Sequence, residues 1–304
     1  MPESPMREPM DELRGVLIPV PTPFRGEEVA PEALRANLAR WNQTDLAGYV
    51  LLGSTGEFPL LSEHERDQVL ATAREAIPRD KLFLAGTGAD STRQTIRFTR
   101  RAAELGADLA LVITPHYFKR AFAQPAAQLR HYRAVADASP IPILLYHFPQ
   151  NTGINLEPET VATLAEHPNI RGIKESSGDL PRLAHIIHGT PKRFGVLVGA
   201  ALAFLPSLSV GATGGILALG VVAPREICDI YRLGRAGRVE EAREIAYRLV
   251  PVDRGVHGRY GIGGLKAALD LQGAYGGPPR APLAAPDGDA LEEITEILAT
   301  AGLL

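Results

Sequence analysis

Apolar runs alternate with amphipathic segments along most of the chain. The first run, GVLIPVPTPF, covers residues 15–24. Leu34, Leu38 and Trp41 then recur at the spacing of one helix face, which predicts a helix over residues 31–44. The other apolar runs cover residues 48–53, 81–88, 107–115, 142–149, 170–176, 195–200 and 211–219, and helices are predicted between them at 62–76, 91–105, 124–138 and 158–166. The sequence therefore contains eight strand candidates.

The predicted strands are almost continuously apolar, which is typical of strands buried on both faces of a parallel sheet. Eight βα units within about 220 residues match a (β/α)8 TIM barrel, whereas a doubly wound sheet more often has about five to seven strands. We therefore predict an α/β fold with a barrel at 15–223. Residues 224–304 are predicted to form a C-terminal helical extension packed on the barrel. Its predicted helices cover 225–233, 238–250, 263–272 and the segment from Asp289, with a docked loop at 276–288.

Composition and charge narrow the functional classes. The chain is 45% hydrophobic and 22% charged with a net charge of −3, so it lacks the basic excess that nucleic-acid binding requires. Its first fifteen residues do not resemble a signal peptide, and no apolar run reaches the length of a membrane span. We expect a soluble, cytoplasmic protein with neither nucleic-acid nor membrane partners. The single cysteine, Cys228, excludes an internal disulfide, and we interpret it as buried packing.

Lysine is rare in this chain, which makes each one informative. The five lysines are Lys81, Lys119, Lys174, Lys192 and Lys266. Lys174 lies near the end of the sixth predicted strand, IRGIKES, and active sites of TIM barrels lie at the C-terminal ends of strands. Burial there disfavours the ammonium form and leaves an amine that can condense with a ketone. The alternative is a lysine that reaches solvent or pairs with Glu175.

Three further strand ends carry polar groups suited to the same chemistry. The second predicted strand ends in GSTGE, where the hydroxyls and N–H groups of Ser54 and Thr55 suit the carboxylate of a 2-oxo acid. The alternative for this pentapeptide is a purely structural turn. Tyr146, in YHFPQNTG, and Tyr117, in TPHYFK, each offer a phenol for proton transfer. The alternatives are a core tyrosine for Tyr146 and a packed loop aromatic for Tyr117.

The motifs GSTGE, TPHYF, YHFPQNTG, GIKESSGDL and GATGGI occur in the order and spacing of a known family. The chain resembles the dihydrodipicolinate synthase and N-acetylneuraminate lyase family over nearly its whole length after residue 15. The resemblance implies a class I lyase that handles pyruvate, in a homotetramer built from dimers.

The resemblance also implies roles for individual residues. Lys174 matches the Schiff-base lysine and Tyr146 the proton-relaying tyrosine, with Thr55 and Tyr117 as the other relay members. Whether Tyr117 serves its own subunit or a neighbouring one is left open. Ser54 and Thr55 match the loop that binds the pyruvate carboxylate, and Ile216 matches a residue that lines the imine pocket. The predicted substrate-binding residues also include Asn151, Ser176 and Gly199.

One position departs from the family's pattern. Dihydrodipicolinate synthases typically have an arginine before the Thr-Gly of the tyrosine motif, where it holds the carboxylate of aspartate semialdehyde, and this chain has Asn151. Asparagine supplies neither charge nor a bidentate fork. GSTGEFPLLSEHER, PQNTG, GIGGLK and GAYGGPPRAPL resemble instead the 4-hydroxy-2-oxoglutarate aldolase branch. We predict cleavage of that substrate to pyruvate and glyoxylate, with dihydrodipicolinate synthase as the alternative.

Other classes of function remain as alternatives. GTGAD at 86–90 lacks the third glycine and acidic partner of a dinucleotide fingerprint, and His185 and His188 have no HExxH pattern around them. We therefore expect no nicotinamide cofactor and no metal. A phosphate-sugar isomerase, for which GATGG offers a weak phosphate motif, and a catalytically silent ligand-binding or regulatory barrel share the predicted fold. Fold alone does not separate them from an aldolase.

Overall fold

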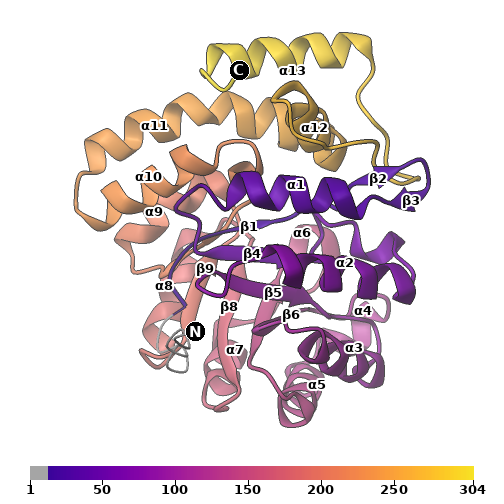
Figure 1. The fold of residues 1–304 in the computed structure, drawn as a ribbon. Coiled ribbons are helices and arrows are strands. Elements are labelled where there is room, and N and C mark those ends of the chain that lie inside the picture. The colour runs from indigo at the N-terminus through magenta and orange to yellow at the C-terminus, as the bar shows by residue number, and fades with distance from the viewer. Residues whose placement is uncertain (1–12) are drawn as a thin grey trace, which may run out of the picture.

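The structure is a computed structural model that describes residues 13–304. Within these residues, eight parallel strands form a closed barrel in the order β1-β10-β9-β8-β7-β6-β5-β4 (Figure 1). The strands are β1 (Gly15–Pro19), β4 (Gly48–Leu51), β5 (Leu82–Gly86), β6 (Leu109–Ile113), β7 (Ile143–His147), β8 (Ile170–Glu175), β9 (Gly195–Val198) and β10 (Gly214–Ile216). Each of the eight predicted apolar runs contains one of them. The prediction of a TIM barrel is confirmed.

Both faces of the barrel strands are buried, which explains their continuous hydrophobicity. Side chains alternate along a strand, so Leu144 and Tyr146 of β7 face the barrel interior while Ile143 and Leu145 face the surrounding helices. The first predicted run was too long, because β1 ends at Pro19. Two further prolines follow in this run, and proline has no N–H to donate to a strand ladder. The run ends instead in β2 (Phe24–Arg25), which pairs with β3 (Glu28–Val29) in a small antiparallel sheet.

Helices surround the barrel between successive strands. They are α1 (Pro31–Trp41), α2 (Glu63–Ala76), α3 (Thr92–Glu104), α5 (Pro125–Ala138), α7 (Pro158–Ala165), α8 (Leu180–Gly189) and α9 (Phe204–Ser209), with short turns α4 (Lys119–Phe122) and α6 (Pro149–Thr152). Local signals set several of their starts. Ser62 and Glu65 form a reciprocal capping box at α2, and Asp179 accepts a hydrogen bond from the Arg182 N–H at the start of α8.

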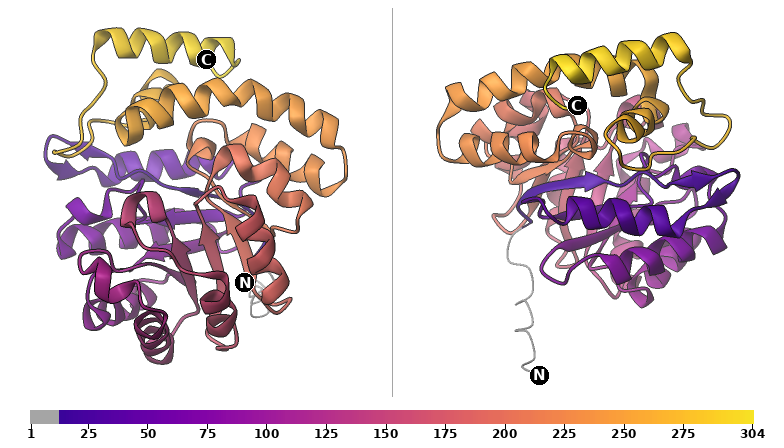
Figure 2. Two further views of the ribbon diagram at one scale, coloured as in Figure 1. Left: turned by 180° about the vertical axis from the view of Figure 1, so that it is seen from behind. Right: turned by 45° about the horizontal axis from the view of Figure 1, so that its top comes forward.

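The C-terminal helices form a layer against one flank of the barrel. They are α10 (Pro224–Arg235), α11 (Val239–Val252), α12 (Arg259–Leu271) and α13 (Gly288–Thr300). A π-helical segment, Asp253–Gly258, joins α11 to α12. Figures 1 and 2 show this layer, orange to yellow, lying beside α1. The α12 segment starts before the predicted 263, but Gly261 breaks its helical geometry with a φ of 58°. The division of the chain at residues 223 and 224 remains a prediction.

Three smaller predictions concern the rest of the chain. Cys228 is buried and forms no disulfide, as expected. The loop 276–288 is docked, because Arg280 within it contacts α2 and the segment after β4. No helix in residues 13–304 is long and apolar enough to cross a membrane. Residues 1–12, which hold most of the segment tested for a signal peptide, lie outside the described residues.

Candidate active site

Lys174 and Tyr146 lie side by side at the C-terminal ends of β8 and β7. They are direct partners in the β7–β8 pairing, and Lys174 Nζ lies 4.3 Å from the centroid of the Tyr146 ring. Both side chains are buried, with exposed fractions of 6% and 4%. The amine and the phenol that the sequence predicted as catalytic are thus brought together at the barrel mouth.

A shift in register creates this pairing. Ile143 pairs with Ile170, but Leu144 pairs with Gly172, so β8 contains one extra residue opposite β7. Without that bulge Tyr146 would lie opposite Ile173 instead of Lys174. Bulges occur often beside active sites, where they re-aim a side chain. The irregularity therefore turns Lys174 toward the barrel interior and Ile173 toward the helices.

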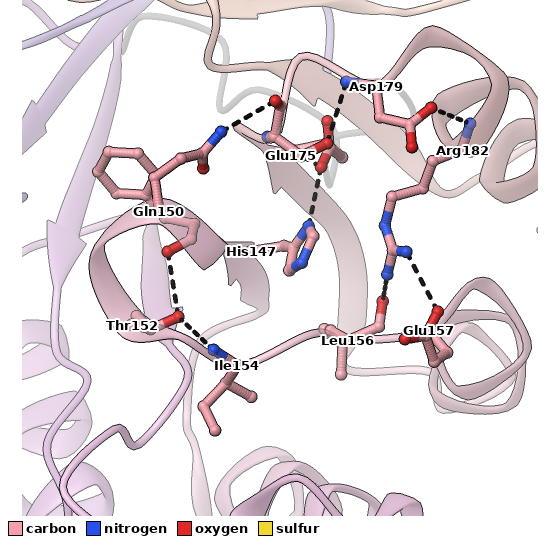
Figure 3. A network of polar contacts seen from close by, with 11 residues as sticks. His147, Gln150, Thr152, Ile154, Leu156, Glu157, Glu175, Asp179 and Arg182 are labelled. Carbon is pink, nitrogen blue, oxygen red and sulfur yellow. Dashed lines mark hydrogen bonds and ion pairs between the residues drawn. The ribbon is translucent and has the colours of Figure 1, made fainter. Parts of the chain in front are cut away.

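Glu175 does not pair with Lys174, because consecutive residues of a strand point to opposite faces. It contacts His147, its partner in the strand pairing, with 2.8 Å between His147 Nδ1 and Glu175 Oε1. Figure 3 shows these two side chains directed at each other. Glu175 Oε1 also accepts a hydrogen bond of 3.0 Å from the Ser177 N–H. Both side chains are buried, and His147 Nε2 has no hydrogen-bond partner among residues 13–304.

Ser176 and Gly199 shape the space around the amine. A Cβ added at Gly199 would lie 1.8 Å from Ser176 Oγ and 3.1 Å from Lys174 Cε, so only glycine fits there. The Gly199 N–H donates to the Glu175 carbonyl oxygen over 2.7 Å. Ser176 Oγ is buried and has no hydrogen-bond partner in the described part of the chain. A buried hydroxyl in this state suits a ligand that supplies the missing partner.

The loop 53–57 lies next to the Tyr146 hydroxyl. Ser54 Oγ lies 3.5 Å from the Tyr146 hydroxyl oxygen, while Thr55 is buried with 7% of its surface exposed. Ile216 is fully buried and belongs to the same interior cluster as Tyr146. Glu57, the last residue of the loop, adopts a left-handed conformation with a φ of 58°. Such a conformation in a residue other than glycine is uncommon and is often found at functional sites.

Tyr117 does not enter this site within its own chain. It is 76% exposed and contacts the equally exposed Phe118, with 5.0 Å between the ring centroids. Tyr117 is therefore not packed within its own chain, and its role stays a prediction. The loop itself is anchored, because Asp90 Oδ1 accepts hydrogen bonds from the N–H groups of His116 and Tyr117. Burial tends to raise the pKa of Asp90, but these donors hold it below its ordinary value.

Asn151 is exposed on α6, the turn that follows β7. The turn is tied to the end of β8, because Gln150 Nε2 donates to the Ser177 carbonyl oxygen over 2.9 Å (Figure 3). Lys119 extends toward the same turn, and a Cβ added at Gly153 would lie 3.0 Å from Lys119 Nζ. Lys119 was not among the predicted site residues. Two signals could have identified it: lysine is rare in this chain, and Lys119 lies in the strand-end motif TPHYFK.

The π-helical segment Asp253–Gly258 contributes a second group that sequence reasoning missed. Burial lowers the pKa of His257, Asp253 opposes that shift, and the nearby charge of Lys174 adds to it. Burial likewise raises the pKa of Asp253. Segments of π-helix are rare and frequent at functional sites, but hydrophobic periodicity does not predict them. The charge of Lys174 therefore acts on His257, a proximity that the sequence pattern does not predict.

Comparison with known proteins connects this geometry to a family. Residues 12–301 match the dihydrodipicolinate synthetase family. The 4-hydroxy-tetrahydrodipicolinate synthase of Methanoculleus marisnigri is 37% identical over 294 residues, which span 95% of this chain and 100% of that protein. The enzyme of the same name from Methanospirillum hungatei is 36% identical and covers 94% of this chain and 98% of its own. The structure of dihydrodipicolinate synthase from Acinetobacter baumannii complexed with pyruvate has a TM-score of 0.91 at 29% identity, covering 96% of this chain and 99% of that one.

These relatives confirm the family but not the predicted branch. The curated relatives carry the name of the synthase, so the prediction that the chain lies closest to the 4-hydroxy-2-oxoglutarate aldolases is not supported. That prediction depended on one position, Asn151, and a few short stretches, whereas the family depends on motifs at five strand ends. The match over residues 12–301 shows that this chain belongs to the dihydrodipicolinate synthetase family and is a lyase of that family.

Proposed function

We propose that this protein forms a Schiff base between Lys174 and pyruvate and condenses it with aspartate semialdehyde, as a 4-hydroxy-tetrahydrodipicolinate synthase. The observation that carries the chemistry is the buried Lys174 amine 4.3 Å from the Tyr146 ring centroid, at the C-terminal end of the barrel. The synthase name of the curated relatives supports the choice of substrates.

The proposed reaction uses the amine as its electron sink. Lys174 Nζ attacks C2 of pyruvate, and the ketone oxygen leaves as water when the C=N bond forms. The positive iminium then draws the electron pair of a C3–H bond as that proton departs, which leaves an enamine. The enamine carbon bonds to the aldehyde carbon, whose oxygen takes up a proton, and the iminium forms again. The amino group of the aspartate-derived half then attacks the iminium carbon and passes a proton to Lys174, which departs as the free amine while the ring closes. Because the iminium supplies the sink, the proposed reaction requires no metal or cofactor.

Proton transfer is assigned to the groups around Tyr146. The Tyr146 ring lies next to the amine, and its hydroxyl lies 3.5 Å from Ser54 Oγ, which suits it to carry protons to and from the reacting oxygen. Thr55, on the loop 53–57, is proposed as the next member of this proton relay. Tyr117 is proposed as a further relay member for a neighbouring subunit, because it is 76% exposed in its own chain. This assignment requires the proposed homotetramer, a dimer of dimers.

The two substrate carboxylates are assigned to different loops. Ser54, Thr55 and the free hydroxyl of Ser176 suit the carboxylate of pyruvate next to the amine. The carboxylate of aspartate semialdehyde is assigned to the turn that carries Asn151. Lys119 supports this assignment, because its ammonium lies over Gly153 and supplies a charge that Asn151 lacks.

A second candidate is the cleavage of 4-hydroxy-2-oxoglutarate to pyruvate and glyoxylate. The neutral side chain of Asn151 favours it, since an asparagine forfeits the charge-assisted pair that an arginine would form with a longer substrate. Glyoxylate is the smaller aldehyde, and its carboxylate is assigned to Ser54, Asn151 and backbone donors. Lys174 has the same role in both reactions.

Borohydride reduction tests the Schiff base directly. Pyruvate and borohydride together are expected to leave a reduced three-carbon adduct on Lys174, which mass spectrometry of its peptide detects. The label should disappear in Lys174→Ala and persist in Lys192→Ala, which removes an exposed lysine elsewhere. An unlabelled Lys174 peptide in the natural protein would contradict the proposal.

Substrate choice is tested by the ratio of kcat/KM for the two reactions. The proposal expects condensation with aspartate semialdehyde to exceed cleavage of 4-hydroxy-2-oxoglutarate in the natural protein. Lys119→Met should lower kcat/KM for condensation by about 10- to 100-fold, the usual value of a hydrogen bond to a charged group. Lys192→Met serves as the matched control. A natural protein that prefers cleavage supports the second candidate.

A further inference from the structure

Glu57 links the loop 53–57 to the C-terminal part of the chain. It is 1% exposed although it follows the two residues assigned to the pyruvate carboxylate. Its Oε1 lies 2.5 Å from Lys266 Nζ on α12. Its Oε2 accepts a hydrogen bond of 2.8 Å from the Arg280 backbone N–H. Both partners belong to residues 224–304, more than 200 positions along the chain.

Lys266 is fully buried, and its environment suits a fixed position. Its Nζ donates to the Pro278 carbonyl oxygen over 3.0 Å and lies 4.5 Å from the centroid of the Phe24 ring. Burial lowers the pKa of Lys266, and the neighbouring Glu57 carboxylate opposes that shift. Neither charge of a buried pair is stable without the other. Lys266 and Glu57 therefore hold each other in place.

Arg280 extends the same contact to both sides of the loop. Its guanidinium forms two hydrogen bonds with the Glu65 carboxylate, of 2.6 and 3.1 Å, and one of 2.8 Å with the Leu60 carbonyl oxygen. It also lies 4.3 Å from the centroid of the Phe24 ring. Glu65 is the capping-box residue of α2. One arginine thus ties the start of α2, the turn before it and Glu57 together.

We propose that Glu57, Lys266 and Arg280 are positioning residues that hold Ser54 and Thr55 in the conformation that binds the pyruvate carboxylate. The C-terminal extension would then determine the affinity for pyruvate without touching it. This inference rests on the proposed function, because that function assigns the carboxylate to the loop 53–57.

Two features favour a role in binding over a role in stability alone. The backbone hydrogen bonds of the loop are local. The Gly56 and Phe58 N–H groups donate to Gly53, the Glu57 N–H donates to Ser54, and the Leu60 N–H donates to Glu57. From outside the loop, Thr22 Oγ1 donates to the Gly56 carbonyl oxygen over 2.7 Å. The left-handed conformation of Glu57 persists only where its surroundings enforce it. In addition, an apolar pair of similar volume usually stabilises a core as well as a buried ion pair does. Stability alone does not require the Glu57–Lys266 pair, whose fixed geometry instead sets the position of the loop 53–57.

The experiment compares the natural protein with the double variant Glu57→Gln and Lys266→Met, which removes both charges together. The pyruvate concentration that gives half-maximal borohydride labelling of Lys174 is the main readout. We expect it to rise by about 10- to 100-fold, as for the loss of hydrogen bonds to a charged group. The KM for the aldehyde and the labelling at saturating pyruvate should stay unchanged. Arg259→Gln, which breaks the Arg259–Glu293 pair in the same extension, is the matched control.

Each outcome separates the inference from the proposed function. A double variant with a lower Tm but an unchanged half-maximal pyruvate concentration overturns the inference and leaves the Schiff base intact. If the natural protein shows no label on Lys174, the proposed function fails and the inference with it. If the double variant does not fold, Arg280→Gln takes its place, because it keeps the backbone hydrogen bond to Glu57. Arg280→Gln should raise the half-maximal pyruvate concentration by a smaller factor than the double variant does. An unchanged half-maximal pyruvate concentration overturns the inference.

Discussion

The two sides of the barrel mouth hold their functional groups by different means. Tyr146 and Lys174 are partners in adjacent strands, so the barrel ladder fixes them and the buried His147–Glu175 contact lies directly beside them. The loop 53–57 lies beyond the end of β4, and its Glu57 forms a buried ion pair with Lys266. Strand pairing therefore holds Tyr146 and Lys174 in place, whereas the position of the loop depends on contacts with a distant part of the chain. Substitutions of Tyr146 and Lys174 should therefore act on chemistry, whereas substitutions at the loop side should act on binding or stability.

The largest effect is expected at Tyr146. Tyr146→Phe should lower kcat by about 10²- to 10⁴-fold, because a positioned acid–base group contributes that much, while borohydride labelling of Lys174 persists. Steady-state kinetics and mass spectrometry check both parts. Tyr231→Phe, which removes a hydroxyl that donates to the Thr213 carbonyl oxygen on the outer side, is the control. Near-normal turnover in Tyr146→Phe would show that Tyr146 packs in the core and transfers no proton.

A smaller effect is expected behind the strand ends, at His147. His147→Leu leaves the buried Glu175 carboxylate without its side-chain partner, which should lower the free energy of unfolding by about 1 to 3 kcal/mol. Chemical denaturation measures the change. His147→Asn, which can still donate a hydrogen bond, should lose less. Equal losses in the two variants would show that the volume of the ring matters and the hydrogen bond does not.

The smallest effect is expected at the loop side, in the Arg280–Glu65 contact. Hydrogen bonds from Arg280 lower the pKa of Glu65 from 4.5 to about 2, so this carboxylate stabilises the fold above pH 4.5 and stops doing so as the pH falls toward 2. Glu65→Gln should therefore cost about 0.2 to 1 kcal/mol at pH 7. The difference in Tm from the natural protein should shrink below pH 4.5. A difference that stays constant from pH 7 to pH 3 would contradict the assignment.

Much of the fold and part of the site follow from local patterns. Continuous apolar runs indicated all eight barrel strands because parallel strands are buried on both faces. The strand-end rule for TIM barrels located Lys174, Tyr146 and Ser54, whose side chains meet in the structure. Substrate choice was harder to predict. Asn151 indicated a missing charge, but the position of Lys119 Nζ over Gly153 depends on the packing of two loops that are distant along the chain.

The sequence by itself determined the alternation of strands and helices and the residue types at the strand ends, because these depend on the chemistry of neighbouring positions. Only the tertiary structure decided which of those residues meet. The bulge that sets Tyr146 opposite Lys174 depends on the pairing of two strands. The contact between Glu57 and Lys266 depends on how a helix packs beside the barrel. Both are contacts between segments distant along the chain, and hydrophobic periodicity carries information about one segment at a time.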